Sequence, residues 1–395
     1  MASDRAIQSQ MSATNITPPS KVNAPAGLYI HIPFCRSKCA YCDFYSITDR
    51  SQVAGYLHAL SREMEQTREF APLFDTVYVG GGTPSCLDTR QLAELLHRVR
   101  KDFPIAPDAE ITVEVNPGDV DTVFMRGLRD AGVNRVSIGV QSFDNSILKS
   151  LGRRHDGREG REAVDAARAA GFDNIGVDLI YGVPGQSHDL WQQTMETALG
   201  FNPEHLSCYE LTLEDGTPFH RRLERGEFSL PGEEEAYRFF SVTSTFLEQR
   251  GYTHYEVSNF ARDCTLISRH NHKYWDHTAC LGLGPAAHSF KGARRWWNHR
   301  SLEFYERDVL SGRAPVAGEE DLSAEELRLE ALYFGFRTKR GIHGPEFRER
   351  YGIDLFREKG PALRCLRDEG LVTLDDEFLA PTRRGLALAD RLCLL

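Results

Sequence analysis

Three cysteines that lie close together, Cys35, Cys39 and Cys42, are the residues best suited to do chemistry. Their C-x3-C-x2-C spacing fits three corners of a cubane 4Fe–4S cluster, whose usual ligands are thiolates. Three protein thiolates leave one iron of the cube open, so that it can bind a small molecule. Three buried free cysteines, or part of a zinc site, are the alternatives. Zinc takes a further Cys or His at comparable spacing, whereas Asp43 and Phe44 follow the third cysteine.

Length and composition describe an ordinary globular protein. The 395 residues suffice for one large barrel-like domain and a smaller one, and the hydrophobic and charged contents, 41% and 26%, are unexceptional. Nine cysteines are an odd number for an extracellular protein, so we expect a reducing, cytoplasmic setting. A net charge of −10 argues against a large nucleic-acid footprint.

The first residues carry no structural pattern. Residues 1–25 are polar and rich in Pro, Ser and Thr, and they lack the apolar run of a secretory signal. We predict a disordered leader there, with an organellar targeting peptide as the alternative. No stretch of the chain is long and apolar enough to predict a membrane span.

Six short runs rich in β-branched residues alternate with helical segments. The predicted strands are residues 28–31, 76–79, 111–115, 135–140, 175–180 and 205–209, with helical periodicity at residues 91–101, 158–170 and 188–199. This order predicts an α/β fold with parallel strands and right-handed crossovers, in a curved, incompletely closed (β/α)6 barrel. Binding residues gather at the carboxyl ends of the strands in parallel barrels, so function is read there.

Glycine and polar residues occupy those strand ends. The run GGGTP follows the second strand, where glycines let the backbone approach a ligand, although a tight turn explains the run equally well. Glu114 and Asp178 lie in otherwise apolar strands, where a carboxylate is costly unless something pairs with it. We therefore expect both carboxylates to contact a ligand. Gln141 follows the fourth strand.

The cysteine motif, with Tyr41 before its third cysteine, resembles that of the radical S-adenosylmethionine (SAM) superfamily. The resemblance implies that SAM chelates the fourth iron and is cleaved reductively to methionine and a 5′-deoxyadenosyl radical. The strand ends are similar to the coproporphyrinogen dehydrogenase-like branch, which implies methionine contacts from Gly81, Gly82 and Thr83. It also implies that the other polar groups and the ribose of SAM are held by Glu114, Gln141, Arg153 and Asp178, and that Tyr29 and Tyr41 line the pocket.

Two features separate the chain from coproporphyrinogen III dehydrogenase itself. That enzyme has a further cysteine where this chain has Phe44, and an N-terminal extension where this chain has a polar leader. The runs YEVSNFA and HNHKYW instead resemble the HemW-like haem chaperones over about residues 27–390. The resemblance implies binding of haem and its delivery to apo-haem proteins, with a 4Fe–4S cluster and SAM. Oxygen-independent coproporphyrinogen III dehydrogenation, or another porphyrin-modifying radical reaction, is the alternative.

In that family the segment H-N-x-x-Y-W marks the haem-binding branch, and it is here His270, Asn271, Tyr274 and Trp275. Imidazole is a good partner for haem iron, and aromatic faces pack against a porphyrin. Hydrogen-bonded packing at the lip of the barrel explains the group equally well. Substitutes for the first histidine are His272, His277 and His288. The later run RRWWNHR could hold propionates or be a solvated edge strand, and we leave it unassigned.

The rest of the chain predicts a second, smaller domain. Residues 252–257 predict a seventh strand that ends a barrel spanning residues 26–260, and residues 261–320 hold the HNxxYW segment and a linker. Helices at 324–337, 345–351 and 360–369, then strands at 371–374 and 378–381, predict a winged-helix-like α+β domain over residues 321–395. The resemblance also admits an electron donor such as flavodoxin or ferredoxin, and a homodimer. We expect no nucleic-acid partner.

Overall fold

The computed structural model describes residues 24–393. Apart from its last two residues, the predicted leader lies outside this range. Among the described residues, none of the helices combines the length and the apolar character needed to cross a membrane.

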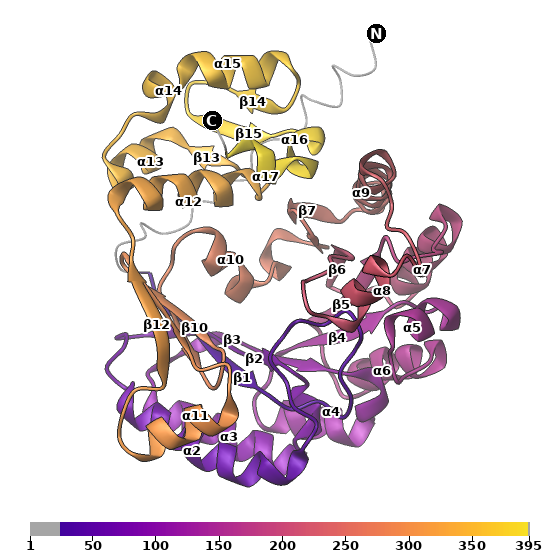
Figure 1. Cartoon of the computed structure of the whole chain (residues 1–395), viewed down its shortest axis with the longest axis vertical. Helices are drawn as coiled ribbons and strands as arrows, with labels where there is room; N and C mark the ends of the chain where they lie inside the picture. Colours follow the sequence, from indigo (N-terminus) through magenta and orange to yellow (C-terminus); the bar gives the residue numbers. More distant parts are fainter. Residues whose placement is uncertain (1–23, 394–395) are drawn as a thin grey trace.

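Six parallel strands, adjacent in chain order, form the centre of a twelve-stranded sheet. They are β1 Ala26–Ile32, β2 Phe74–Gly81, β3 Ile105–Val115, β4 Arg135–Gln141, β5 Ile175–Tyr181 and β6 His205–Glu210. The helices between them lie on the convex side of the curved sheet (Figure 1). These are α2 Val53–Gln66, α3 Thr89–Asp102, α4 Thr122–Asp130, α5 Asn145–Leu151, α6 Gly157–Ala169 and α7 His188–Gly200. The predicted α/β partial barrel is confirmed.

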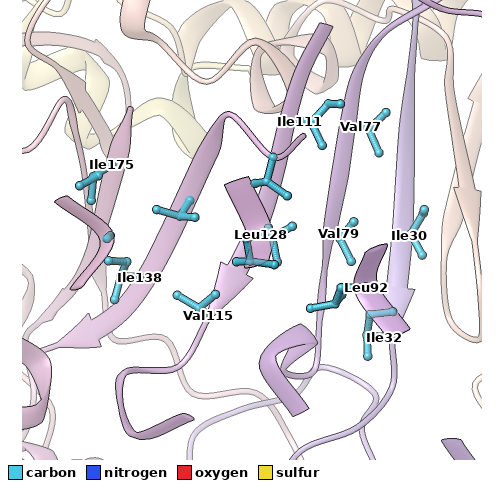
Figure 2. Packing of buried hydrophobic residues seen from close by; sticks show 14 of the residues in the cluster. Ile30, Ile32, Val77, Val79, Leu92, Ile111, Val115, Leu128, Ile138 and Ile175 are labelled. Carbon is cyan, nitrogen blue, oxygen red and sulfur yellow. The ribbon is translucent and has the colours of Figure 1, made fainter. Parts of the chain in front are cut away.

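The two faces of this sheet differ in chemistry because side chains alternate along each strand. One set is apolar and fully buried against the helices, as Ile30, Val79 and Ile138 illustrate (Figure 2). The next residue along often carries a polar group and faces the concave side, as Tyr29 and Tyr78 do. The core therefore lies outside the barrel wall, and the inner face is left polar.

The sheet continues beyond both ends of the parallel strands. Next to β6 lie β8 Asn259–Ala261 and β7 Thr253–Glu256, with α8 Pro218–Glu224 and α9 Glu233–Glu248. Next to β1 lies β9 Cys280–Leu283, which runs parallel to it. The edge is completed by β10 His288–Lys291, β11 Arg294–Asn298 and β12 Val316–Asp321, with α10 Arg269–Trp275 and α11 Leu302–Leu310.

Residues 261–320 thus differ from the linker that the sequence predicts. Four strands of this segment belong to the main sheet, and β9 pairs with β1, about 250 residues earlier in the chain. Gly282 permits the close approach of β10 to β9, because a Cβ there would lie 2.3 Å from the backbone oxygen of His288.

The C-terminal unit has a small sheet and a core of its own. Its strands are β13 Ile342–His343, β15 Phe378–Pro381 and β14 Val372–Leu374, in that spatial order. Its helices are α12 Ala324–Phe336, α13 Gly344–Tyr351, α14 Leu355–Glu358, α15 Gly360–Asp368, α16 Arg383–Ala387 and α17 Ala389–Leu392. Backbone bonds join it to the barrel, from Val257 N to Arg337 O at 2.9 Å and from Lys339 N to Tyr255 O at 3.0 Å.

Candidate cluster and cofactor site

The three cysteines lie on a loop that follows β1 and is closed at its base. Cys35 N donates to Ile47 O at 3.0 Å, and Ile47 N donates to Pro33 O at 2.8 Å. Between the cysteines, Arg36 forms an ion pair of 2.9 Å with Asp119, whose side chain is fully buried. The loop is therefore held from both its own base and the loop that follows β3.

The glycine turn after β2 packs directly against this cysteine loop. Gly82 N donates to Ile32 O at 2.8 Å, and Thr83 N donates to Phe34 O at 2.7 Å. A Cβ on Gly82 would lie 2.8 Å from both carbonyl oxygens, so only glycine fits. Gly81 has φ +104°, in the region that favours glycine. The turn fixes the backbone that immediately precedes Cys35.

A pocket lies between the loop and the turn. It is lined by Cys35, Arg36, Ser37, Lys38, Cys39, Tyr41, Cys42, Ser46, Gly82, Thr83, Asn116, Arg153 and Arg154. Arg153 reaches the thiols from the segment after α5, with Nη1 3.6 Å from Cys39 Sγ. Its Nη2 donates to Asn116 Oδ1 at 2.9 Å and to Gly139 O at 2.6 Å. A buried cation beside thiols favours their thiolate form.

The arrangement of these three thiols is compatible with ligation of a 4Fe–4S cluster. All three are free and line one pocket, and Thr83 Oγ1 lies 3.3 Å from Cys35 Sγ. No three His, Cys, Asp or Glu side chains among residues 24–393 converge as they would on a single ion. A cubane does not require that convergence, because each thiolate binds a different iron. Burial raises the pKa of the Cys42 thiol to about 11, so ionisation there depends on a bound cation.

Glu114 on β3 connects the glycine turn to the inner face of the barrel. The Tyr78 hydroxyl donates to its Oε1 at 2.7 Å, and Gly81 N donates to its Oε2 at 3.2 Å. Burial, helped by the negative charge of Asp178, raises the pKa of Glu114 to about 7. A buried carboxylate at this position is ready to ionise when a cation or a donor arrives.

The other predicted polar residues lie on β4 and β5. Ser137 Oγ donates to the Asp178 carboxylate at 3.0 and 3.1 Å, and burial raises the pKa of Asp178. Gln141 has φ +65°, which is unusual for a residue with a side chain and is typical of functional sites. Its buried Oε1 has no hydrogen-bond partner among residues 24–393. The site therefore offers an unused acceptor where the cofactor is expected. The Asp178 carboxylate and Gln141 Oε1 are acceptors that suit the ammonium and hydroxyl groups of SAM.

The structure places the predicted haem residues of α10 in different surroundings. The His270 side chain is 1% exposed, with ring nitrogens 2.9 Å from Thr76 Oγ1 and 3.0 Å from Tyr274 Oη. Its ring stacks on Tyr78 at 5.1 Å, and burial lowers its pKa to about 3. Both ring nitrogens are thus engaged, and His270 is not open to a ligand in this conformation.

The remaining residues of the HNxxYW segment do not form one surface. Tyr274 is 44% exposed, whereas Trp275 packs edge-on against Phe334 of α12 in the C-terminal unit at 6.0 Å. Asn271 N donates a capping hydrogen bond to Ser268 Oγ at 3.4 Å. The Tyr29 ring lies 6.4 Å from the His270 ring, and Tyr29 is not among the residues that line the cysteine pocket.

Several residues that build the site are not predicted from the sequence. Tyr78 supports both Glu114 and His270, Asn116 holds Arg153, and His31 receives the Tyr29 hydroxyl at 3.1 Å. The period of two along β1 and β2 could have found Tyr78 and His31, since both share the inner face with residues already chosen.

Two family models and several known proteins match this chain. The model of the radical SAM superfamily matches residues 29–198, and that of the HemN C-terminal domain matches residues 322–388. A haem chaperone HemW of Mycobacterium tuberculosis is 38% identical over 376 residues, which cover 93% of each chain. One of Bacillus subtilis is 33% identical over 92% of this chain and 96% of its own.

A solved structure gives the same result for the fold. The coproporphyrinogen III oxidase HemN of Escherichia coli, a radical SAM enzyme, superposes with a TM-score of 0.81 at 25% identity. The match covers 95% of this chain and 91% of that chain, so both units are included.

Proposed function

The chain belongs to the HemW family within the radical SAM superfamily, and from that premise we propose that it binds haem and delivers it to apo-haem proteins. The observation that carries the proposal is the similarity to haem chaperones over more than nine tenths of both chains. HemN matches the same length at lower identity, which makes coproporphyrinogen oxidation the less favoured reading.

A 4Fe–4S cluster and SAM belong to this superfamily, and the site contains residues suited to both. Cys35, Cys39 and Cys42 would hold the cluster, with Arg153 balancing its charge. The glycine turn would lie against the methionine end of SAM, while Glu114 and Asp178 would accept hydrogen bonds from the donors of SAM. Bound together, the two groups supply one-electron chemistry, and the protein residues orient them and limit access of water.

Phe44, the second residue after the cysteine motif, supports delivery of haem over oxidation of a porphyrinogen. Phe44 is 66% exposed where coproporphyrinogen III dehydrogenase has a further cysteine. Hydrogen abstraction needs its substrate held closely against the reacting carbon, and an open rim does not give that enclosure.

The α10 helix would contribute to haem contact mainly through Tyr274. Tyr274 is partly exposed while its hydroxyl is held inside by His270 Nε2 at 3.0 Å, so His270 would act as a positioning residue. We place the protein in the cytoplasm, with an electron donor of the flavodoxin or ferredoxin class, apo-haem proteins as recipients and a homodimer as its assembly.

Anaerobic reconstitution followed by haem titration tests the proposal, with a parallel assay for conversion of coproporphyrinogen III. We expect saturable haem binding and no protoporphyrinogen formation by the reduced, SAM-loaded protein. Robust protoporphyrinogen formation would establish the oxidase reading instead, and absence of haem binding would remove the chaperone reading.

A further inference from the structure

Among the histidines in and after α10, His288 differs from His270 and His277 in its surroundings. The His277 ring is held on both sides, at 2.8 Å by Tyr351 Oη and at 3.1 Å by Glu330 Oε2. His270 is enclosed as described. His288 is exposed, and neither of its ring nitrogens forms a hydrogen bond within residues 24–393.

His288 also lies at the functional edge of the barrel. It is the first residue of β10, which runs antiparallel to β9, while β9 runs parallel to β1. The start of β10 therefore lies where β1 and β9 end, beside the beginning of the cysteine loop. Gly282, the partner of Tyr29 on the inner face, has the His288 backbone oxygen directly above it.

The side of β10 that carries His288 is turned toward the C-terminal unit. Phe290, two residues on and hence on the same face, stacks on the His277 ring at 5.3 Å. Its cross-strand partner Arg295 reaches Glu330 of α12 at 2.5 Å. The imidazole of His288 thus lies on the same strand face as Phe290, the face that meets the C-terminal unit through His277 and Glu330.

Groups suited to a flat dianion surround this imidazole. Trp297 pairs with His288 across the strands, and the two rings stack at 5.9 Å with an interplanar angle of 26°. Arg300 is 57% exposed and has one exposed partner, Asp43, at 2.8 Å; such a surface pair exchanges at little cost. Partial burial of the imidazole lowers the pKa of His288, and the charges of Arg295 and Arg300 lower it further. The ring is therefore kept neutral, as a metal ligand requires.

We propose that His288 is the axial ligand of haem iron, with Trp297 covering the edge of the porphyrin and Arg300 receiving a propionate. This inference rests on the proposed haem-binding function and assigns its iron ligand outside the HNxxYW segment. Imidazole is a common axial ligand of haem, and guanidinium is well matched to carboxylates. Binding exchanges the Arg300–Asp43 ion pair for one with the ligand.

Titration of the reconstituted full-length protein with haemin and with metal-free protoporphyrin tests the assignment. His288→Ala should weaken haemin binding by at least roughly tenfold, since even second-shell losses at metal sites cost about that much. It should leave metal-free protoporphyrin binding unchanged, and added imidazole should restore the absorption spectrum of ligated haem. Arg300→Gln should lower the affinity for haemin and for metal-free protoporphyrin several-fold. His97→Ala, an exposed histidine on α3, is the matched control and should change neither affinity.

Two outcomes would overturn the assignment while leaving the proposed function intact. One is unchanged haemin affinity in His288→Ala with haem binding by the parent protein. The other is an equal loss for haemin and metal-free protoporphyrin, which would mean that His288 only packs against the ring. A parent protein that binds no haemin would remove both the assignment and the proposed function.

Discussion

The pH dependence of SAM binding should report the ionisation of Glu114. Burial raises the pKa of this carboxyl to about 7, so near neutral pH about half of the free protein carries it protonated. A protonated carboxyl cannot accept from the ammonium or hydroxyl groups of SAM on both oxygens. SAM should therefore bind the ionised form, and its affinity should rise as the pH rises through the pKa.

The size of the effect follows from the pKa. For a ligand that binds only the ionised form, a pKa of about 7 makes the apparent dissociation constant roughly tenfold larger at about pH 6 than at about pH 8. Glu114→Gln keeps the shape of the side chain but cannot titrate, so it should lose this dependence. It should also bind SAM roughly tenfold to a hundredfold more weakly at the higher pH, the cost of a hydrogen bond to a charged group.

Calorimetry on the anaerobically reconstituted protein measures both quantities. Ionisation of groups on SAM changes its affinity for parent and variant equally. The ratio of the two dissociation constants at each pH therefore reports the ionisation of Glu114 alone. A parent and a Glu114→Gln variant with the same pH profile would refute the placement of this carboxylate against SAM. Retention of the cluster absorbance in the variant excludes loss of the cluster as the cause.

Three further predictions concern the turn, the core and the cluster. Gly82→Ala should abolish SAM binding or cluster retention, because its Cβ would lie 2.8 Å from two backbone oxygens that cannot move aside; normal values of both would contradict this packing. Burial raises the pKa of Glu63 to about 7, above its ordinary 4.5. The protonated side chain therefore stabilises the folded state fully below about pH 4.5, and this stabilisation is lost as the pH rises through 7. That shift corresponds to about 3 kcal/mol, and denaturation of Glu63→Gln should lack this decline; an identical pH profile in parent and variant would count against it. A variant with serine at Cys35, Cys39 and Cys42 should bind no cluster iron after reconstitution and should keep the circular dichroism spectrum of the parent. An iron content equal to that of the parent would exclude the cluster assignment.

The strand pattern predicted the barrel well because each inner-face residue alternates with a buried apolar one. Glu114 and Asp178 were found in this way, as charged residues in otherwise apolar strands. The pairing of β9 with β1 joins segments about 250 residues apart, and no local pattern encodes it. For the same reason the sequence predicts only the HNxxYW segment and a linker over residues 261–320, and not the four strands that this segment adds to the sheet.

The haem residues show a different limit. The sequence identifies His270 as an imidazole in a motif, but its availability depends on Thr76 of β2 and Tyr274 of its own helix. Only the fold shows that both ring nitrogens are taken. Arg153 similarly draws its position from Asn116 and Gly139 on separate elements.

Transfer of haem to a recipient protein shows directly whether this protein delivers haem. The haem-loaded protein is mixed with an excess of an apo-haem protein, and the rise of the recipient's own absorption spectrum is followed over time. We expect transfer to the recipient to be faster than from free haemin at the same concentration, with loss of haem from the donor. Haem that stays on the protein, or transfer no faster than from free haemin, would contradict the role in delivery.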